Sequence, residues 1–221
     1  MGFNVAIDGP AGAGKSTIAK LVAKEKNFIY VDTGAMYRAI ALYLLRKGVQ
    51  PEEKDRFAEE CQGAEVSLKY ENGVQQVWLN GKDVSGFIRT EEVGNMASAS
   101  SVDKAVREKL LDLQKNMAAE YDVVMDGRDI GTNILPNADV KVYLTASVEE
   151  RAMRRFKELM DKGEPCDYDQ IEKDIAERDY RDMHRDIAPL KQAEDAVLID
   201  SSDMTIEEVK TAILKLIDEK L

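Results

Sequence analysis

The stretch GPAGAGKST, residues 9–17, decides how this chain folds. It follows the short apolar run FNVAID (3–8) and leads into STIAKLVAKEK (16–26), whose apolar residues recur at three- and four-residue spacing. This pattern predicts a buried strand, a tight glycine-rich turn and an amphipathic helix. Four residues fit the spacing GxxxxGK[ST] in the strand-to-helix context that this pattern requires, namely Gly9, Gly14, Lys15 and Ser16.

Glycines in such a turn let backbone N–H groups approach phosphate oxygens, and the start of the helix adds unpaired N–H groups and the positive end of its dipole. Lys15 would reach the β- and γ-phosphates of ATP, and the Ser16 hydroxyl would ligate the Mg²⁺ that bridges them. The alternative is a plain glycine-rich turn with an exposed lysine. We therefore expect ATP to be bound by Gly9, Pro10, Ala11, Gly12, Ala13, Gly14, Lys15, Ser16 and Thr17.

The composition limits the kind of partner. The 221 residues carry a formal net charge of -11, which argues against a broad basic face for nucleic acid but leaves room for a small anion in a locally positive cleft. Cys61 and Cys166 lie far apart and outside any metal-ligand spacing, so we expect free thiols. No long apolar segment is present, and we predict a cytoplasmic protein that binds neither membrane nor nucleic acid.

Short apolar runs rich in β-branched residues recur along the chain, as expected for strands that are buried on both faces of a parallel sheet. Segment 64–88 instead alternates polar and apolar residues around two Asn-Gly pairs and predicts a small antiparallel excursion. Between these elements, helical spacing is found in 34–48, 106–121 and 205–221. The predicted buried strands are 3–8, 27–32, 122–127, 139–144 and 195–200.

The highly charged segment 149–186 has a helical pattern with a possible break at 163–169, and it is typical of a mobile flap. In helices, two sets of three arginines would each share one face and could point into a cleft: Arg151, Arg154 and Arg155, and Arg178, Arg181 and Arg185. The alternative is a solvated helix held by weak surface ion pairs. Arginine rather than lysine favours bidentate contacts to phosphate.

Two further motifs follow predicted strands, where loops of an open α/β sheet line the ligand crevice. DGRDIGT (126–132) combines two carboxylates, an arginine and two glycines; an internal Asp-Arg turn is its simpler interpretation. DTGAMYR (32–38) occupies the same kind of position. His184 lies among charges without a catalytic partner set, so we expect an ordinary surface histidine.

The motifs GPAGAGKST, DTGAMYR, IRTEEVGNMAS, DGRDIGT and ERDYRDMHRDIAPL, with the hairpin insertion between them, resemble bacterial cytidylate kinases over nearly the whole chain. The resemblance implies an α/β fold of the nucleoside monophosphate kinase type, with a five-stranded parallel P-loop core, a small antiparallel hairpin insertion and a helical lid. The implied division is a core in 1–32, 93–148 and 187–221, a monophosphate-binding part in 33–92 with the hairpin 64–88, and a lid in 149–186, all in one compact unit.

The implied reaction is the in-line transfer of a phosphoryl group from ATP, with Mg²⁺, to CMP or dCMP, in pyrimidine nucleotide metabolism. Lys15, Arg128, Arg178 and Arg185 would be catalytic, and we expect a monomer. By the resemblance, the acceptor would be bound by Thr33, Tyr37, Arg38, Ser98, Arg107, Arg128, Asp129, Arg178, Asp182 and Arg185.

Three alternatives remain open at this stage. The acceptor could be UMP or another small molecule in the same fold, or the chain could be an ATP-binding switch that transfers no phosphoryl group. The adenine could rest near Ser201 and Ser202, although a helix cap by Ser or Asp before TIEEV explains these residues equally well.

Overall fold

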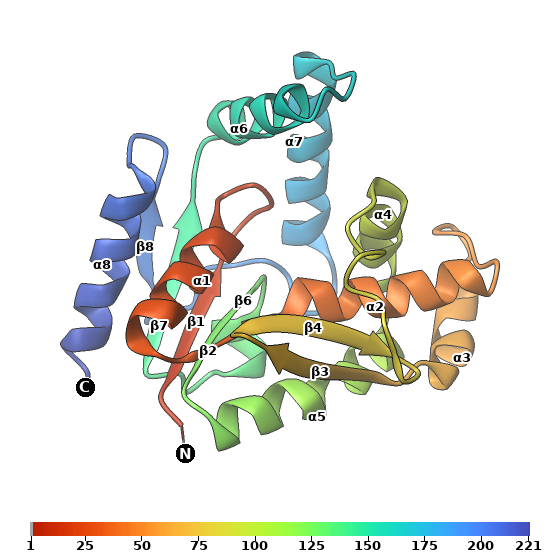
Figure 1. Ribbon diagram of the computed structural model, residues 1–221. Coiled ribbons are helices and arrows are strands. Elements are labelled where there is room, and N and C mark those ends of the chain that lie inside the picture. Colours follow the sequence, from red (N-terminus) through yellow and green to blue (C-terminus); the bar gives the residue numbers. More distant parts are fainter. Residues whose placement is uncertain (1) are drawn as a thin grey trace. The chain divides into compact units, whose positions relative to one another are not determined.

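The computed structural model describes residues 2–221 and contains a five-stranded parallel sheet and a three-stranded antiparallel sheet (Figure 1). The parallel strands follow the order β2-β6-β1-β7-β8. Their bounds are β1 Asn4–Asp8, β2 Ile29–Asp32, β6 Val123–Gly127, β7 Val140–Thr145 and β8 Val197–Asp200. All five predicted strands and the predicted α/β class are confirmed.

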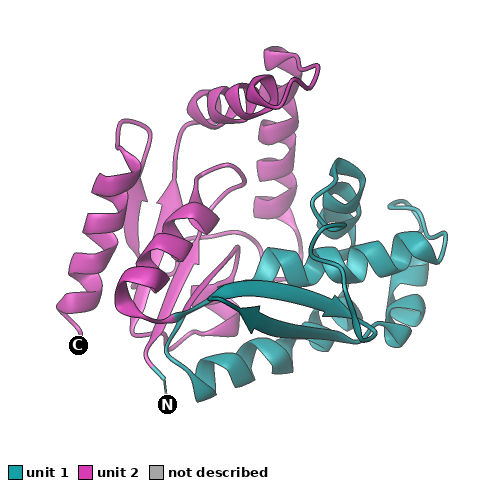
Figure 2. Cartoon of the chain, in the orientation of Figure 1, with its two compact units in different colours: residues 1–2, 29–123 teal, residues 3–28, 124–221 magenta. Residues whose placement is uncertain are grey.

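The chain forms two compact units (Figure 2). Unit 1 contains Gly2 and residues 29–123, and unit 2 contains residues 3–28 and 124–221. Unit 2 therefore holds the glycine-rich loop and the charged helical segment, whereas unit 1 holds the hairpin insertion.

Unit 2 is built on strands that are buried on both faces. Val5, Ala6 and Ile7 of β1 are fully buried, and β1 pairs in parallel with β7, which pairs in parallel with β8. Helix α1 packs against α8, and α6 packs against α7. The helices are α1 Lys15–Lys26, α6 Val148–Asp161, α7 Tyr168–His184 and α8 Ile206–Asp218, with one π-helical turn, η3, at Ile130–Ile134.

The end of β1 shows why the loop after it is rich in glycine. A Cβ on Gly9 would lie 1.9 Å from the carbonyl oxygen of Leu144 on β7, so no larger residue fits there. Gly14 has φ +86° at the N-cap of α1, in the left-handed region that favours glycine. The loop is therefore held against the sheet before the helix begins at Lys15.

Unit 1 carries the antiparallel sheet, formed by β3 Val66–Glu71, β4 Val74–Leu79 and β5 Lys82–Asp83. Both Asn-Gly pairs are turns with positive φ, at 52° and 76° for Asn72-Gly73 and at 49° and 76° for Asn80-Gly81, as expected for tight hairpins. The helical elements are α2 Thr33–Arg46, η1 Lys54–Arg56, α3 Phe57–Glu60, η2 Cys61–Gly63, α4 Glu91–Ser100 and α5 Lys104–Glu120.

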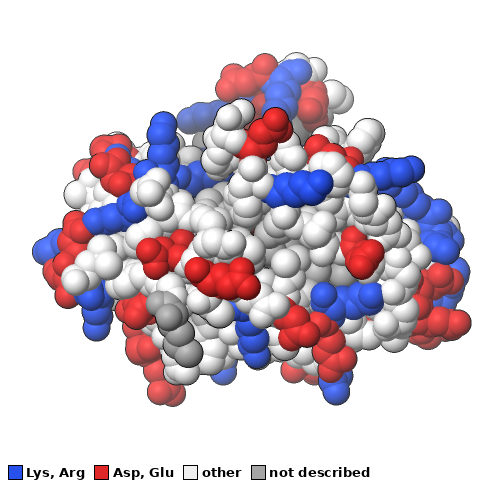
Figure 3. Space-filling view, turned by 60° about the horizontal axis from the view of Figure 1, so that its bottom comes forward, with Lys and Arg blue, Asp and Glu red and all other residues white. Residues whose placement is uncertain are grey.

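Acidic and basic side chains are interspersed among uncharged ones on the face that Figure 3 presents. Cys61 and Cys166 are free thiols, as predicted. Among residues 2–221, no helix has both the length and the apolar character needed to cross a membrane.

Candidate active site

Lys15 occupies a buried position at the start of α1. Its ammonium donates to the Pro10 carbonyl at 2.6 Å, and the residue is only 6% exposed. Burial, and then repulsion from Arg128, lower the pKa of Lys15 well below its usual value, whereas Asp126 and Asp8 act in the opposite direction. Two neighbouring cations in a poorly hydrated site favour an anion, which would restore the charge balance.

Ser16 and Asp126 lie side by side at the ends of α1 and β6. The Ser16 hydroxyl donates to the carboxylate of Asp126 at 2.8 Å. Both oxygens are hard ligands, and Mg²⁺ in phosphate sites takes one or two protein oxygens beside phosphate and water. The pair therefore fits the predicted Mg²⁺ site, and it adds Asp126 to the predicted ligand Ser16.

The loop after β6 makes two ion pairs, one with α7 and one with the residue that directly follows α7. Arg128 donates to Asp182 at 2.9 Å, and Arg185 approaches Asp129 at 3.4 Å. Asp182 is buried, which raises its pKa, yet Arg128, Arg178 and Arg185 together hold that pKa below its usual value. Three guanidinium groups thus lie around one buried carboxylate, so unit 2 brings together the motif after β6 and the predicted lid residues Arg178, Asp182 and Arg185.

The other arginines of the flap do not all share this region, which corrects the prediction of two common faces. Arg181 is exposed, and Arg155 pairs with Glu158 at 2.9 Å with 46% of its side chain exposed. Side chains three or four positions apart lie on the same broad face of a helix, but they do not point in the same direction. One arginine of a set can therefore be buried while another is exposed.

Arg151 has a different environment from the one predicted. Its side chain is 4% exposed and pairs with Asp179 of α7 at 2.6 Å. It also donates to the carbonyl of Ala146 at 2.9 Å and to that of Ala11 in the glycine-rich loop at 3.0 Å. Arg151 therefore fixes the loop, the start of α6 and α7 relative to one another.

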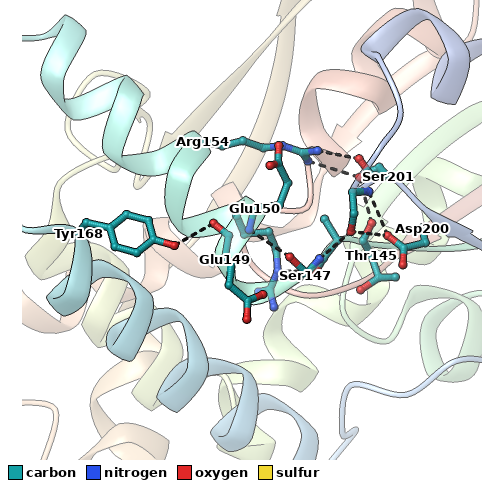
Figure 4. A network of polar contacts seen from close by, with 11 residues as sticks. Thr145, Ser147, Glu149, Glu150, Arg154, Tyr168, Asp200 and Ser201 are labelled. Carbon is teal, nitrogen blue, oxygen red and sulfur yellow. Dashed lines mark hydrogen bonds and ion pairs between the residues drawn. The ribbon is translucent and has the colours of Figure 1, made fainter.

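Figure 4 shows a network that ties the start of α6 to the loop after β8. Arg154 donates to the Ser201 carbonyl at 2.7 Å, the backbone N–H of Ser147 donates to the Ser202 hydroxyl at 2.9 Å, and Ser201 donates to Thr145. Thr205 itself caps α8 in a capping box with Glu208, so the interpretation of Ser201 and Ser202 as a helix cap is wrong.

Unit 1 holds the other predicted acceptor residues around α2. Arg38 donates to the carbonyls of Ile88 and Thr90 at 3.0 and 3.3 Å, and Arg107 on α5 lies 5.7 Å from the ring centre of Tyr37. Thr33 is buried at the first position of α2, and Ser98 is half-buried on α4.

Asp32 is the first residue of the motif DTGAMYR, but it was not among the predicted site residues. Its carboxylate caps α2 by accepting from the Ala35 N–H at 2.9 Å, and it pairs with Arg89 at 2.5 Å. The position of an Asp directly before a helical pattern is the sequence signal for this cap.

Asp8 is a further buried carboxylate outside the predicted site residues. One oxygen accepts from the N–H of Ile130 at 2.8 Å and the other from that of Gly131 at 2.7 Å. Burial raises the pKa of Asp8 to about 6, although these two bonds lower it. A carboxylate that directly precedes a glycine-rich loop was the available signal, but its partners lie 122 and 123 residues away.

Comparisons with known proteins agree with this geometry. The model of the cytidylate kinase family matches residues 5–219. The cytidylate kinase of Caldicellulosiruptor bescii is 49% identical over 97% of this chain and 95% of its own length, and that of Bacillus subtilis is 45% identical over 99% and 97%.

Solved structures support the fold. The shikimate kinase of Acinetobacter baumannii, solved with shikimate, has a TM-score of 0.50 and 17% identity, covering 99% of this chain and 94% of its own. An uncharacterized protein from Eubacterium ventriosum has a TM-score of 0.52 and 14% identity, with 98% of each chain covered. With the family match spanning nearly every residue and the phosphate loop, the Ser16–Asp126 pair and the arginine cluster in place, this chain belongs to the cytidylate kinase family.

Proposed function

We propose that this chain phosphorylates CMP and dCMP with ATP as donor, by direct transfer of the γ-phosphoryl group. The observation that carries the proposal is the cluster in unit 2, where buried Lys15 lies at the start of α1 and Arg128 and Arg185 pair with the buried carboxylates of Asp182 and Asp129. Such a cluster suits the charge of a transferring phosphoryl group, for which positioning and electrostatic stabilisation supply most of the catalysis.

Residues 9–17 would bind the phosphates of ATP, and Lys15 would stabilise charge on the β- and γ-phosphates. When bound, Mg²⁺ would neutralise part of the negative charge of the phosphates, and Ser16 and Asp126 would hold it. The acceptor phosphate is ionised at neutral pH, so the reaction needs no general base. Arg128, Arg178 and Arg185 would stabilise the group in transfer.

Cytosine offers an amino donor at N4 and acceptors at N3 and O2, which a carboxylate and guanidinium groups complement. Asp129 would accept from the amino group, and Arg107 and Arg128 would donate. Thr33, Tyr37, Arg38, Ser98 and Asp182 are proposed as further contacts of the nucleotide. Uracil would place a carbonyl opposite the carboxylate, at a cost of about 1–3 kcal/mol for the mismatched buried groups.

The substrate is tested by ADP release in a coupled assay with CMP, dCMP, UMP and AMP as acceptors. We expect turnover with CMP and dCMP to exceed that with UMP. Transfer of labelled γ-phosphate to CMP separates a kinase from an ATP-binding switch, and ADP formation without labelled CDP would contradict the proposal. A cytoplasmic location and a monomeric state remain predictions.

A further inference from the structure

The loop that carries Arg128 and Asp129 is held by a residue near the start of the sequence, more than 120 positions away. Asp8 ends β1, directly before the phosphate loop, and is 5% exposed. Each of its carboxylate oxygens accepts one backbone N–H, from Ile130 and from Gly131. These N–H groups begin η3, where helix geometry leaves them without intrahelical partners.

The usual residue to bind such N–H groups is the N-cap, and here that residue is Asp129. The Asp129 side chain makes no capping hydrogen bond. It instead accepts from Asn133 at 3.1 Å and pairs with Arg185 at 3.4 Å. Because Asp8 binds the amides, η3 does not need the Asp129 carboxylate as its cap, and that carboxylate makes these side-chain contacts instead.

Only a carboxylate satisfies both amides from this position. Asparagine has one acceptor oxygen, and its NH₂ group would face the second N–H. The approach also needs a small residue on the loop, since a Cβ on Gly131 would lie 3.4 Å from an Asp8 oxygen and 3.2 Å from Cδ of Lys141. Placing a carboxylate here is costly, because burial opposes its charged form and Asp129 adds a second negative charge nearby.

We propose that Asp8 is a positioning residue for the acceptor nucleotide: by capping η3 in place of Asp129, it keeps the Asp129 carboxylate directed to substrate. The inference rests on the base-reading role proposed above for Asp129. Without the second bond from Asp8, the freed Gly131 N–H occupies the position that an N-cap side chain normally binds. The Asp129 carboxylate then rotates to accept a hydrogen bond from the Gly131 N–H and no longer points to the substrate.

Asp8→Asn tests this inference. We expect the ratio of kcat/KM for CMP to that for UMP to fall about tenfold, the factor expected for one hydrogen bond to a charged group. KM for ATP should change by no more than about twofold, since the phosphate loop keeps its own glycine and Arg151 contacts. Amide hydrogen exchange in residues 128–134 should accelerate.

Asp103→Asn is the matched control. Asp103 caps α5, but one oxygen accepts from both Ala105 and Val106, so asparagine retains both bonds. This variant should keep the nucleotide ratio and the exchange of residues 128–134. If Asp8→Asn does not fold, Gly131→Ala provides a second perturbation of the same contact, with the same expected loss of discrimination.

The outcomes separate the two proposals. If Asp129→Ala lowers the CMP to UMP ratio but neither Asp8→Asn nor Gly131→Ala does, the positioning role is wrong and the role of Asp129 stands. If Asp129→Ala leaves the ratio unchanged, both are wrong. Unchanged exchange in residues 128–134 of a folded Asp8→Asn variant would also overturn the positioning role.

Discussion

At the scale of single residues, Lys15 is placed for chemistry at the expense of stability. Its pKa is depressed by burial, so the native state binds this proton less tightly than the unfolded chain and the charge is destabilising at neutral pH. Lys15→Met keeps most of the apolar stem and removes the charge. We expect kcat with CMP to fall by about 10² or more, while the free energy of unfolding stays equal or rises.

Urea unfolding and coupled ADP release on the same preparation check this pairing of effects. A variant that is inactive because it has lost several kcal/mol of stability would contradict the explanation, as would one that turns over at a near-normal rate.

Asp8 should make the stability of the protein fall as pH rises, which is opposite in sign to the effect of most carboxylates. Its folded pKa of about 6 lies above the usual 3.8, so between these values the native state holds a proton that the unfolded chain releases. This stabilising contribution is present below about pH 4 and is lost as pH rises through about 6.

Asp8→Asn removes that titration. The difference in free energy of unfolding between wild type and Asp8→Asn should therefore shift against wild type by about 1 kcal/mol from pH 5 to pH 7. Urea unfolding of both proteins at the two pH values measures it, and a difference that is independent of pH would show that Asp8 titrates normally.

At the scale of elements, the antiparallel sheet of unit 1 is bound to the end of β2 by a side chain that hydrogen-bonds to both backbone groups of one residue. The Asp32 N–H donates to the Gln75 side-chain oxygen at 2.9 Å, the Gln75 amide donates back to the Asp32 carbonyl at 3.4 Å, and Tyr70 donates to the Tyr30 carbonyl. Gln75→Ala leaves a part-buried backbone N–H unpaired, and we expect a loss of about 1–3 kcal/mol in stability.

Gln76→Ala is the control. The Gln76 amide donates to exposed Glu71 and its oxygen accepts from the Trp78 ring at 3.3 Å, but no backbone group depends on it, so the variant should lose no more than about 0.5 kcal/mol in stability. Equal thermal midpoints for the Gln75 and Gln76 variants would show that the hydrogen bonds between Gln75 and Asp32 contribute little to stability.

Helix α7 is fixed by a buried ion pair. Arg151 and Asp179 are 3% and 7% exposed, so Asp179→Ala strands a buried guanidinium at a cost of about 3–5 kcal/mol. Glu158→Ala breaks the exposed pairs with Arg155 and Lys162 and should cost no more than about 1 kcal/mol. Urea midpoints of the two variants compare them directly, and similar losses would mean that burial is not what makes the first pair important.

These examples show what the sequence could predict and what it could not. Strands, the hairpin and the main helices follow from local periodicity, and the two Asn-Gly turns follow from the φ values that only a few residues tolerate. Helix α4 was not predicted, because it is short and its buried face, Val93, Met96, Ala97 and Ser100, consists half of small residues. Asp8, Arg151 and Asp179 were missed as contacts because their partners lie far along the chain or on another face.

At the scale of the whole molecule, the net charge of -11 is compatible with anionic substrates because each cationic group that matters is local and partly buried. Charges on the outer surface are screened within about 8 Å at physiological salt, whereas the cluster around Asp182 is shielded from water. The formal charge of the chain therefore says little about the potential that a bound phosphate experiences.

Ligand-linked stability tests whether both nucleotides bind as proposed. A ligand at 100 times its Kd stabilises the native state by about 2.7 kcal/mol, which is a rise in Tm of about 5–10 °C for a chain of this size. We expect such shifts with CMP alone and with a non-hydrolysable ATP analogue alone. Lys15→Met should lose most of the rise in Tm with the ATP analogue and keep the rise with CMP, because the charge that it removes is proposed to contact the phosphates of ATP.

Asp129→Ala should show the reverse pattern, with a smaller CMP shift and an intact ATP-analogue shift. This crossed result requires two separable binding functions in one folded chain, since a general loss of structure would reduce both shifts in both variants. A folded variant that loses both shifts at once would mean that the two residues do not divide the nucleotides between them.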